Sequence, residues 1–199
     1  MLSLALACGC GEEVKIKNAY DMSVSTKIYG LTSEAISSAQ SFFAEEVCVA
    51  GNENILSEHV TDSLSQAAAL FDLNGKEMLF GKNVHERLYP ASTTKILTAY
   101  TAIKHGDLKA SATVTEAHLQ LEAGSSVCGL AVGDTIDLEN LLYGLILCSG
   151  NDAANVIADI VSGSSGEFVK LMNQEAKAIG ATNSNFMNPH GLHDENHYT

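Results

Sequence analysis

The chain has 199 residues, 46% of them hydrophobic and 18% charged, a balance typical of a globular domain with its own core and unlike that of a disordered chain. The formal net charge is −13, with 24 acidic against 11 basic residues and a single arginine, Arg87, which argues against a nucleic-acid partner because phosphate binding requires clustered Lys and Arg. The longest strongly apolar run in the body of the chain, 141–148, is far shorter than the roughly 20 residues of a membrane span.

The N-terminal residues are apolar and end in Ala5-Leu6-Ala7, a pattern suited to signal-peptide cleavage, although they lack the usual basic segment. We expect residues 1–10 to be the remnant of an export signal; the alternative is a buried first strand or helix. Lipid attachment at Cys8 is left open. Residues 11–63 contain no motif and are expected to be a leader or linker, with apolar spacings over 33–46 that fit a short amphipathic helix.

The cysteines show no spacing typical of a zinc or redox motif, so we expect no metal site. They are Cys8, Cys10, Cys48, Cys128 and Cys148. Cys148 ends an apolar run, and we expect it to be a small buried apolar residue, not a nucleophile.

The first clear structural signal is a hairpin. Two strand-like runs, 67–73 and 76–80, flank Asn74-Gly75, the dipeptide that best accepts the positive φ angles of a type I′ turn. We therefore predict an antiparallel pair of strands here.

A helix that carries a hydroxyl and an amine follows. Pro90 suits a helix start, and apolar residues at spacings of one, four and seven from Ile96 continue the helix to Gly106. Ser92 falls in the first turn, and Lys95 lies three residues later on the same side. The amine can then take the hydroxyl proton, as in a serine nucleophile with a lysine base. For this spacing alone, the alternative is a solvated helix face.

Helix caps and apolar spacing predict three more helices. They span 138–147, 153–161 and the segment between Ser164 and Gly180. Asp137 is the expected N-cap of the first and either Asn151 or Asp152 that of the second, with Gly163 as its end. Ser149 is expected in the loop between these two helices. A capping box, Ser164-Ser-Gly-Glu167, opens the third helix.

Three motifs occur together in one order: Tyr89-Pro-Ala-Ser-Thr-Thr-Lys95, Ser149-Gly-Asn151 and Asn188-Pro-His-Gly-Leu-His193. In this combination the chain, from about residue 67 to 199, resembles the serine D-alanyl-D-alanine carboxypeptidases, the low-molecular-weight penicillin-binding proteins of peptidase family S11. The resemblance implies an α/β (α+β) fold of the β-lactamase and transpeptidase type, in which a hairpin, a nucleophile helix and a helical subdomain precede strands that complete the sheet.

The family's third motif, K-T-G, is missing, since neither Lys-Thr-Gly nor Lys-Ser-Gly occurs in the 199 residues. We therefore expect residues 64–199 to be a partial transpeptidase-like domain, truncated before that motif and inactive alone.

The resemblance implies a role for each site residue. Ser92 would form the acyl-enzyme, Lys95 would act as the base, Ser149 would relay a proton to the leaving nitrogen, and Asn151 would hold the substrate backbone. The backbone N–H of Ser92 would be one oxyanion donor. No cofactor and no metal are implied.

The implied substrates are peptidoglycan stem peptides ending in D-Ala-D-Ala, with β-lactams as covalent inhibitors. The implied location is the extracytoplasmic face of the bacterial cell envelope, with a role in cell-wall synthesis and cell shape. Peripheral membrane association through a C-terminal region beyond Thr199 is left open.

Two other functions stay open. A serine β-lactamase is disfavoured because Gly150 replaces the Asp of S-D-N and no deacylating Glu motif is found. A non-catalytic or truncated penicillin-binding-like module fits the absent K-T-G. For Ser149 and Asn151 the plainer alternative is a helix cap and turn. His190 and His193 are expected to be polar structural residues of a loop, because lysine already supplies the base.

Overall fold

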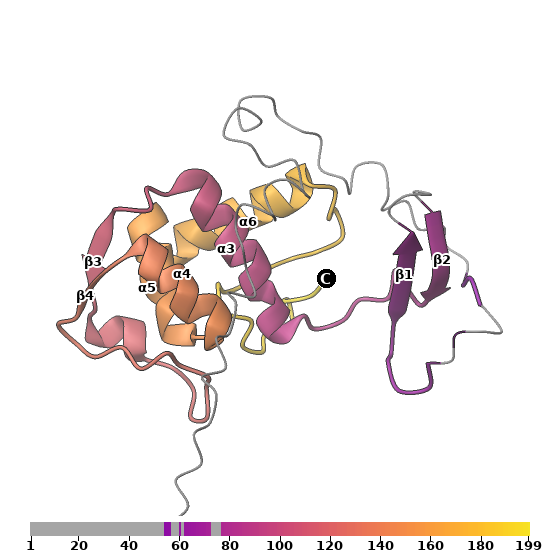
Figure 1. The fold of residues 1–199 in the computed structure, drawn as a ribbon, viewed down its shortest axis with the longest axis horizontal. Coiled ribbons are helices and arrows are strands. Elements are labelled where there is room, and N and C mark those ends of the chain that lie inside the picture. The colour runs from indigo at the N-terminus through magenta and orange to yellow at the C-terminus, as the bar shows by residue number, and fades with distance from the viewer. Residues whose placement is uncertain (1–53, 57–59, 61, 73–76) are drawn as a thin grey trace, which may run out of the picture. The chain divides into compact units, whose positions relative to one another are not determined.

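The computed structural model describes residues 54–56, 60, 62–72 and 77–199. The expectations for 1–10 and 33–46 lie outside these residues. The described elements, in chain order, are β1 Ala68–Asp72, β2 Glu77–Lys82, the 3-10 turn η2 Ala91–Thr93, α3 Thr94–His105, β3 Ser111–Thr113, the 3-10 turn η3 Glu116–Leu119, β4 Thr135–Asp137, α4 Leu138–Leu147, α5 Asn151–Ser162 and α6 Ser165–Ala178 (Figure 1).

Strands β1 and β2 form the predicted antiparallel pair. Ala68 lies opposite Lys82, and Asp72 lies opposite Glu77. The register shifts after Leu70, so that β2 contains one extra residue, as in a β-bulge. The Asn74-Gly75 turn lies outside the described residues.

The nucleophile helix begins as predicted after Pro90 and ends at Gly106, but Ser92 lies in the 3-10 turn η2 that leads into α3. Gly106 is required here by packing, because a Cβ at this position would lie 2.5 Å from Leu138 Cδ2 and 2.8 Å from the Ala102 carbonyl oxygen. The close approach of α4 thus fixes the end of the helix.

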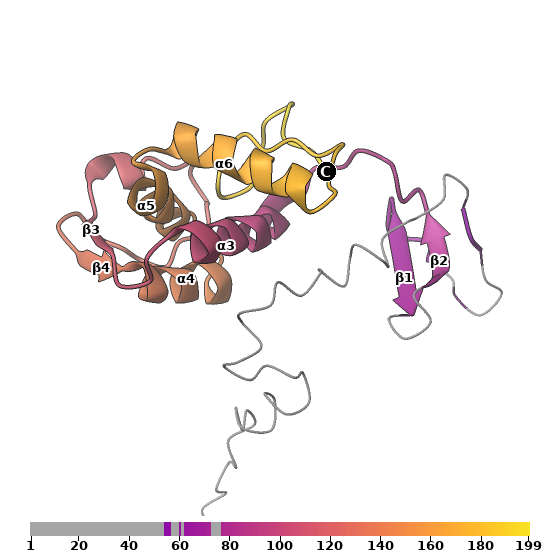
Figure 2. The same ribbon diagram turned by 90° about the horizontal axis from the view of Figure 1, so that it is seen from above.

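Helices α3, α4, α5 and α6 pack around one apolar core, and Figures 1 and 2 show α3 next to α6. The core is centred on fully buried residues of α4, α5 and α6, among them Leu138, Leu141, Leu145, Ile157, Phe168 and Met172. Asp137 caps α4 as predicted, accepting from the Asn140 N–H at 2.8 Å. No helix in the described part combines the length and the apolarity that a bilayer span needs.

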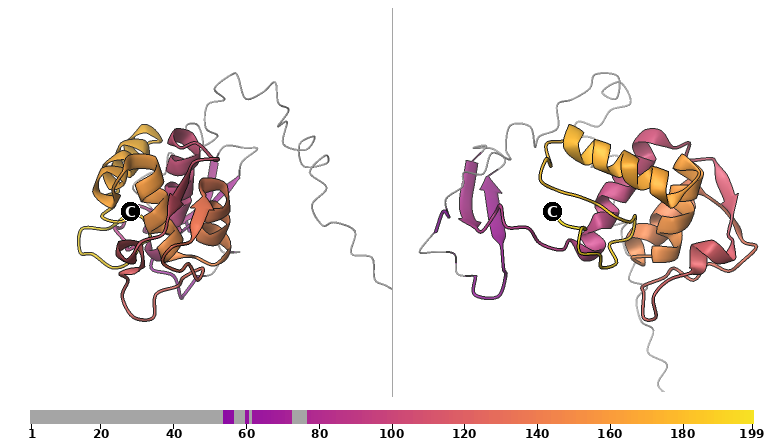
Figure 3. Two further views of the ribbon diagram at one scale, coloured as in Figure 1. Left: turned by 90° about the vertical axis from the view of Figure 1, so that its left-hand side faces the viewer. Right: turned by 180° about the vertical axis from the view of Figure 1, so that it is seen from behind.

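A second small sheet was not predicted from the sequence. Strands β3 and β4 pair antiparallel, with Ser111 opposite Asp137 and Thr113 opposite Thr135. Three residues are too few for an alternating apolar pattern to stand out, which is why the sequence does not reveal this pair. Figure 3 shows these strands at one end of the helices.

The end of the chain returns to the start of the nucleophile helix (Figures 1 and 3). Thr199 and Leu88 exchange two backbone hydrogen bonds of 3.0 Å, and Asn185 pairs with Tyr198. The loop from Asn185 to Tyr198 is therefore closed at its base. We call it the C-terminal loop.

Candidate active site

Ser92 is exposed and lies at the start of a helix. The preceding Ala91 has a φ of 48°, in the left-handed region that non-glycine residues seldom occupy. Thr93 donates its backbone N–H to the Pro90 carbonyl at 3.1 Å, which closes the 3-10 turn around Ser92. The first N–H groups of a helix lack a partner within the helix, and the Ser92 N–H is one of them.

Lys95 is buried beneath Ser92, with 2% of its surface exposed. Its Nζ donates to Ser92 Oγ at 3.2 Å and to the His190 carbonyl oxygen at 2.7 Å. Burial lowers the pKa of Lys95 from 10.5 to about 8 because the ammonium form loses solvation. With that pKa, about one amine in ten is neutral at neutral pH, and only the neutral amine can accept the serine proton.

The carbonyl that meets Lys95 belongs to a tight turn over residues 188–192. The Asn188 side chain ties this turn together: its Oδ1 accepts from the Gly191 N–H at 2.7 Å, and its Nδ2 donates to the Leu192 carbonyl at 2.9 Å. Gly191 has a φ of 86°, and a Cβ there would lie only 1.8 Å from the Ala91 carbonyl oxygen. The turn therefore packs directly against the backbone that precedes Ser92.

The two histidines of the third motif are placed differently. Burial, with smaller contributions from electrostatic interaction with Lys95 and His197, lowers the pKa of His190 to about 4, so this ring is neutral at neutral pH. His193 is exposed and lies edge-on to Tyr89, with ring centroids 4.7 Å apart. Within the described residues, neither ring hydrogen-bonds to the serine hydroxyl.

Ser149 and Asn151 lie at the junction of α4 and α5. Ser149 has a φ of 54°, again in the left-handed region. The Gly150 N–H donates to the Gly144 carbonyl at 3.1 Å, and the Asn151 N–H donates to the Ser126 carbonyl at 2.8 Å. The backbone of this segment is thus held from both sides.

A hydrogen bond connects Ser92 to Lys95, but none connects this pair to Ser149 or Asn151 among the described residues. The side chains of Ser149 and Asn151 form no hydrogen bond with protein atoms in the described part of the chain. Asn151 is 4% exposed.

Asp152 holds the loop beside this junction. Its carboxylate, on a residue that is 1% exposed, accepts from the backbone N–H groups of Cys128 at 2.9 Å, Gly129 at 3.0 Å and Leu130 at 3.1 Å. Burial alone would raise the pKa of Asp152, but hydrogen bonds from the N–H groups of Cys128, Leu130 and Ala153 lower it below its ordinary 3.8. The prediction that Asn151 or Asp152 is the N-cap was wrong: α5 begins at Asn151, after Gly150, because the carboxylate binds the loop instead.

The prediction for Cys148 was also wrong, because this residue is exposed. The apolar run before it forms α4, whose buried face carries Leu141 and Leu145, and Cys148 follows the helix as its C-cap, away from that face. Cys128 is half-buried, and burial raises the pKa of its thiol to about 11. Within the described residues, no three His, Cys, Asp or Glu side chains are arranged to hold a metal ion.

The sequence and fold of this chain are similar to those of known proteins. The family model described as D-alanyl-D-alanine carboxypeptidase, Peptidase_S11, matches residues 54–199. The chain belongs to this family. D-alanyl-D-alanine carboxypeptidase DacF of Bacillus subtilis is 38% identical over 138 residues, which are 68% of this chain and 36% of that protein. DacC of Escherichia coli is 39% identical over 137 residues, 64% of this chain and 34% of that protein.

Solved structures agree on the fold. The D-alanyl-D-alanine carboxypeptidase of Mycobacterium tuberculosis matches with a TM-score of 0.65 and 33% identity, over 71% of this chain and 52% of that one. Penicillin-binding protein 5 of Haemophilus influenzae matches with a TM-score of 0.64 and 32% identity, over 70% of this chain and 43% of that one. The transpeptidase-like fold predicted from the motifs is thus confirmed. The chain spans about a third to a half of the length of these relatives.

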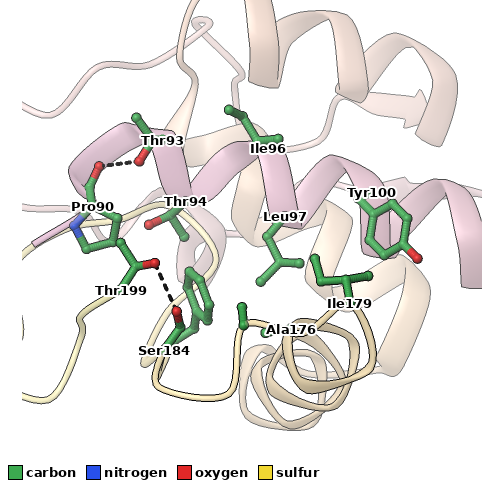
Figure 4. Close-up of a pocket in the computed structure, with 12 residues that line it drawn as sticks. Pro90, Thr93, Thr94, Ile96, Leu97, Tyr100, Ala176, Ile179, Ser184 and Thr199 are labelled. Atoms are coloured by element: carbon green, nitrogen blue, oxygen red, sulfur yellow. Dashed lines mark hydrogen bonds between the residues drawn. The ribbon is translucent and has the colours of Figure 1, made fainter. Parts of the chain in front are cut away.

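An apolar groove of about 540 Å³ lies between α3 and α6. Figure 4 shows Leu97 of α3 facing Ala176 and Ile179 across it. The pair Ser92 and Lys95 lies outside the lining of this groove, although Thr94 of α3 and Phe186 of the C-terminal loop contribute to it.

Sequence reasoning did not find the His190 carbonyl as the partner of Lys95 or the Asp152 carboxylate as the anchor of residues 128–130. A backbone carbonyl leaves no trace in residue types. The Asn188-Pro-His-Gly segment indicates a tight turn, because Asn side chains bind nearby backbone and Gly accepts a positive φ, but it does not indicate what the turn contacts.

Proposed function

We propose that this chain carries the nucleophile side of a serine D-Ala-D-Ala carboxypeptidase, which removes the terminal D-alanine from peptidoglycan stem peptides. One observation carries the proposal: the exposed Ser92 hydroxyl lies 3.2 Å from the Nζ of Lys95, a buried lysine whose pKa is lowered to about 8. The proposal is supported by membership of the S11 family.

In the proposed first step, neutral Lys95 takes the proton from Ser92 Oγ, and the oxygen attacks the carbonyl of the penultimate D-alanine. The Ser92 N–H stabilises the oxyanion of the tetrahedral intermediate. When the C–N bond breaks, the proton passes from Lys95 through Ser149 to the leaving amine of D-alanine. An acyl ester on Ser92 results. Water then attacks this ester with Lys95 as base, and the shortened peptide leaves as a carboxylate.

Ser149 and Asn151 suit these roles because their backbone is fixed while their side chains stay without protein partners. We propose that the Asn151 amide binds the substrate backbone. The family's carboxylate-binding K-T-G motif does not occur in the 199 residues, so the proposal assigns no residue of this chain to the substrate carboxylate.

We also propose that the protein acts on the extracytoplasmic side of the cell envelope. The substrate class requires this location, and the apolar start of the chain, residues 1–10, fits an export signal. In this proposal residues 11–63 are a leader or linker, 64–199 belong to the catalytic domain, and β-lactams are covalent inhibitors.

The test uses the protein expressed from its complete reading frame. Labelled penicillin should attach covalently, and peptide mass spectrometry should place the label on Ser92; labelling that survives Ser92→Ala would refute the assignment. A peptide ending in D-Ala-D-Ala should release D-alanine much faster than a β-lactam is hydrolysed. Faster β-lactam turnover would favour the β-lactamase instead.

A further inference from the structure

The C-terminal loop carries, one residue before its end, a histidine that is almost completely buried. His197 is 2% exposed, and its ring packs edge-on against Phe186, with centroids 5.4 Å apart. The loop that carries it also carries the turn over residues 188–192, which meets Lys95. His197 itself has no hydrogen bond to Ser92 or Lys95 among the described residues.

The hydrogen bonds of His197 determine which of its nitrogens carries the proton. The backbone N–H of Met187 lies 3.3 Å from Nδ1, and because an amide N–H can only donate, Nδ1 must be an acceptor. A neutral imidazole then carries its proton on Nε2. This nitrogen lies 2.9 Å from Thr94 Oγ1, so His197 donates to Thr94.

Three side chains of α3 meet the C-terminal loop side by side. Besides Thr94, the Lys95 Nζ donates to the His190 carbonyl at 2.7 Å, and the Thr98 Oγ1 donates to the Pro189 carbonyl at 2.6 Å. Thr94 and Thr98 are buried one helical turn apart on the same face of α3. Of the three contacts, only the one at Thr94 uses a side chain of the loop.

We propose that His197 is a positioning residue, whose hydrogen bond to Thr94 holds the Pro189 and His190 carbonyls against the nucleophile helix and keeps Lys95 covered. The inference rests on the proposed role of Lys95 as the base. It assigns His197 no contact with substrate.

The charged and titratable groups around His197 favour its neutral form on balance. Burial lowers the pKa of His197, and the nearby Asp194 carboxylate partly opposes this effect. Lys95 and the neutral His190 are the other titratable groups on this side of the loop. A second proton would sit on Nδ1 and face the Met187 N–H, so that two donors would oppose each other.

Loss of the Thr94 contact should change Lys95 in a definite direction. If the turn moves away, water reaches the Nζ and replaces the His190 carbonyl as acceptor. The ammonium form is then better solvated, so the pKa of Lys95 should rise from about 8 toward 10.5.

The experiment measures the pKa of Lys95 by NMR in the protein expressed from its complete reading frame with isotope-labelled lysine, and Lys95→Arg identifies the signal. His197→Phe keeps the ring against Phe186 but removes both hydrogen bonds, and should raise the pKa of Lys95 by about one pH unit. Thr94→Val removes the hydroxyl that accepts from His197, and should raise the pKa of Lys95 by a similar amount. His197→Gln offers an amide oxygen to Met187 and an N–H to Thr94, and should keep the pKa of Lys95 near 8.

His193→Phe is the matched control, because His193 is exposed on the same loop and should leave Lys95 unchanged. An unchanged pKa of Lys95 in folded His197→Phe and Thr94→Val would overturn the proposal and leave His197 a purely structural residue. If His197→Phe does not fold, Thr94→Val decides.

In the unaltered chain, a long-range ¹H–¹⁵N spectrum should show a neutral His197 with its proton on Nε2. A proton on Nδ1 would also overturn the proposal. Because no turnover is measured, a failure to acylate Ser92 would refute the proposed function without affecting this test.

Discussion

The segment around Ser92 and the segment around Ser149 are held in place in different ways. The first segment depends on a loop far along the chain, because Lys95 hydrogen-bonds to the carbonyl of His190, 95 residues later. The second depends on nearby sequence, because the Asp152 carboxylate accepts a hydrogen bond from the Cys128 N–H, 24 residues earlier. The first segment contains Lys95, whose pKa is lowered to about 8, whereas the Asp152 contacts of the second segment fix its backbone geometry. Moving the C-terminal loop should therefore alter proton transfer, and disturbing the Asp152 anchor should alter the placement of Ser149.

The two segments share one feature. Ala91, which precedes Ser92, has a φ of 48°, and Ser149 has a φ of 54°. Non-glycine residues in this region cost of order 1 kcal/mol or more and persist only where surrounding contacts fix them. Both proposed catalytic hydroxyls are thus placed by strained backbone, supported by Gly191 in one case and by Gly144 and Ser126 in the other.

The largest effect should come from Lys95→Arg. Arginine keeps the positive charge but does not release its proton, so acylation of Ser92 by labelled penicillin should fall by about 10³-fold. Lys104→Arg is the matched control, since Lys104 lies on the same helix and its ion pair with Glu175, at 2.6 Å, can be kept by arginine. Wild-type acylation in Lys95→Arg would show that the first segment does not supply the base.

Gly191→Ala should be the most destabilising single change in the C-terminal loop that we describe. The new Cβ would lie 1.8 Å from the Ala91 oxygen and 3.0 Å from Thr94 Oγ1, at a φ of 86°. Overpacking and strain together should lower the free energy of unfolding by about 3–4 kcal/mol in urea denaturation. Gly166→Ala in α6, where a Cβ meets nothing within 4 Å, should have little effect. Equal stability of the two variants would contradict the proposed fit of the turn against Ala91.

Asp152→Asn tests the other segment. The Asn side chain has one accepting oxygen in place of two, so one or more of the N–H groups of residues 128–130 lose their acceptor. The free energy of unfolding should therefore fall by about 2–3 kcal/mol. Asp134→Asn is the control, because the exposed Asp134 accepts from a single backbone N–H, that of Ala131. The pKa of Lys95 should stay near 8 in Asp152→Asn. A shift in that pKa would show that the two segments are coupled and would remove the distinction between them.

The sequence predicted the parts of the molecule that depend on local chemistry. The hairpin strands, the helix between Pro90 and Gly106, the Asp137 cap and the proximity of Ser92 and Lys95 follow from turn residues, caps and helical spacing. The fold class and family followed from three motifs in one order and were confirmed. Residue roles at the site stay predictions.

What the sequence did not predict depends on contacts between distant backbone groups. The His190 carbonyl and the Asp152 anchor contribute or bind main-chain atoms, which every residue has. The exposure of Cys148 could not be predicted from an apolar run, because an amphipathic helix leaves one side of such a run in solvent.

The smallest effect concerns the pH dependence of stability, and between pH 6.5 and about 4 it should come mainly from the first segment. The pKa of His190 is about 4 in the folded chain against an ordinary 6.5, so the unfolded chain takes up this proton first as the pH falls. The stability that His190 contributes is present above pH 6.5 and is lost between about 6.5 and about 4, and we expect a loss of about 1–2 kcal/mol. Burial raises the pKa of Asp152, but hydrogen bonds lower it below its ordinary 3.8, so its contribution to the pH dependence should fall mainly below this range. Urea denaturation at both ends of the range should show the loss in the unaltered chain and a smaller loss in His190→Phe, which cannot take up a proton. An equal loss in that variant would assign the acid sensitivity to other groups, the first of them the buried His197 beside Thr94.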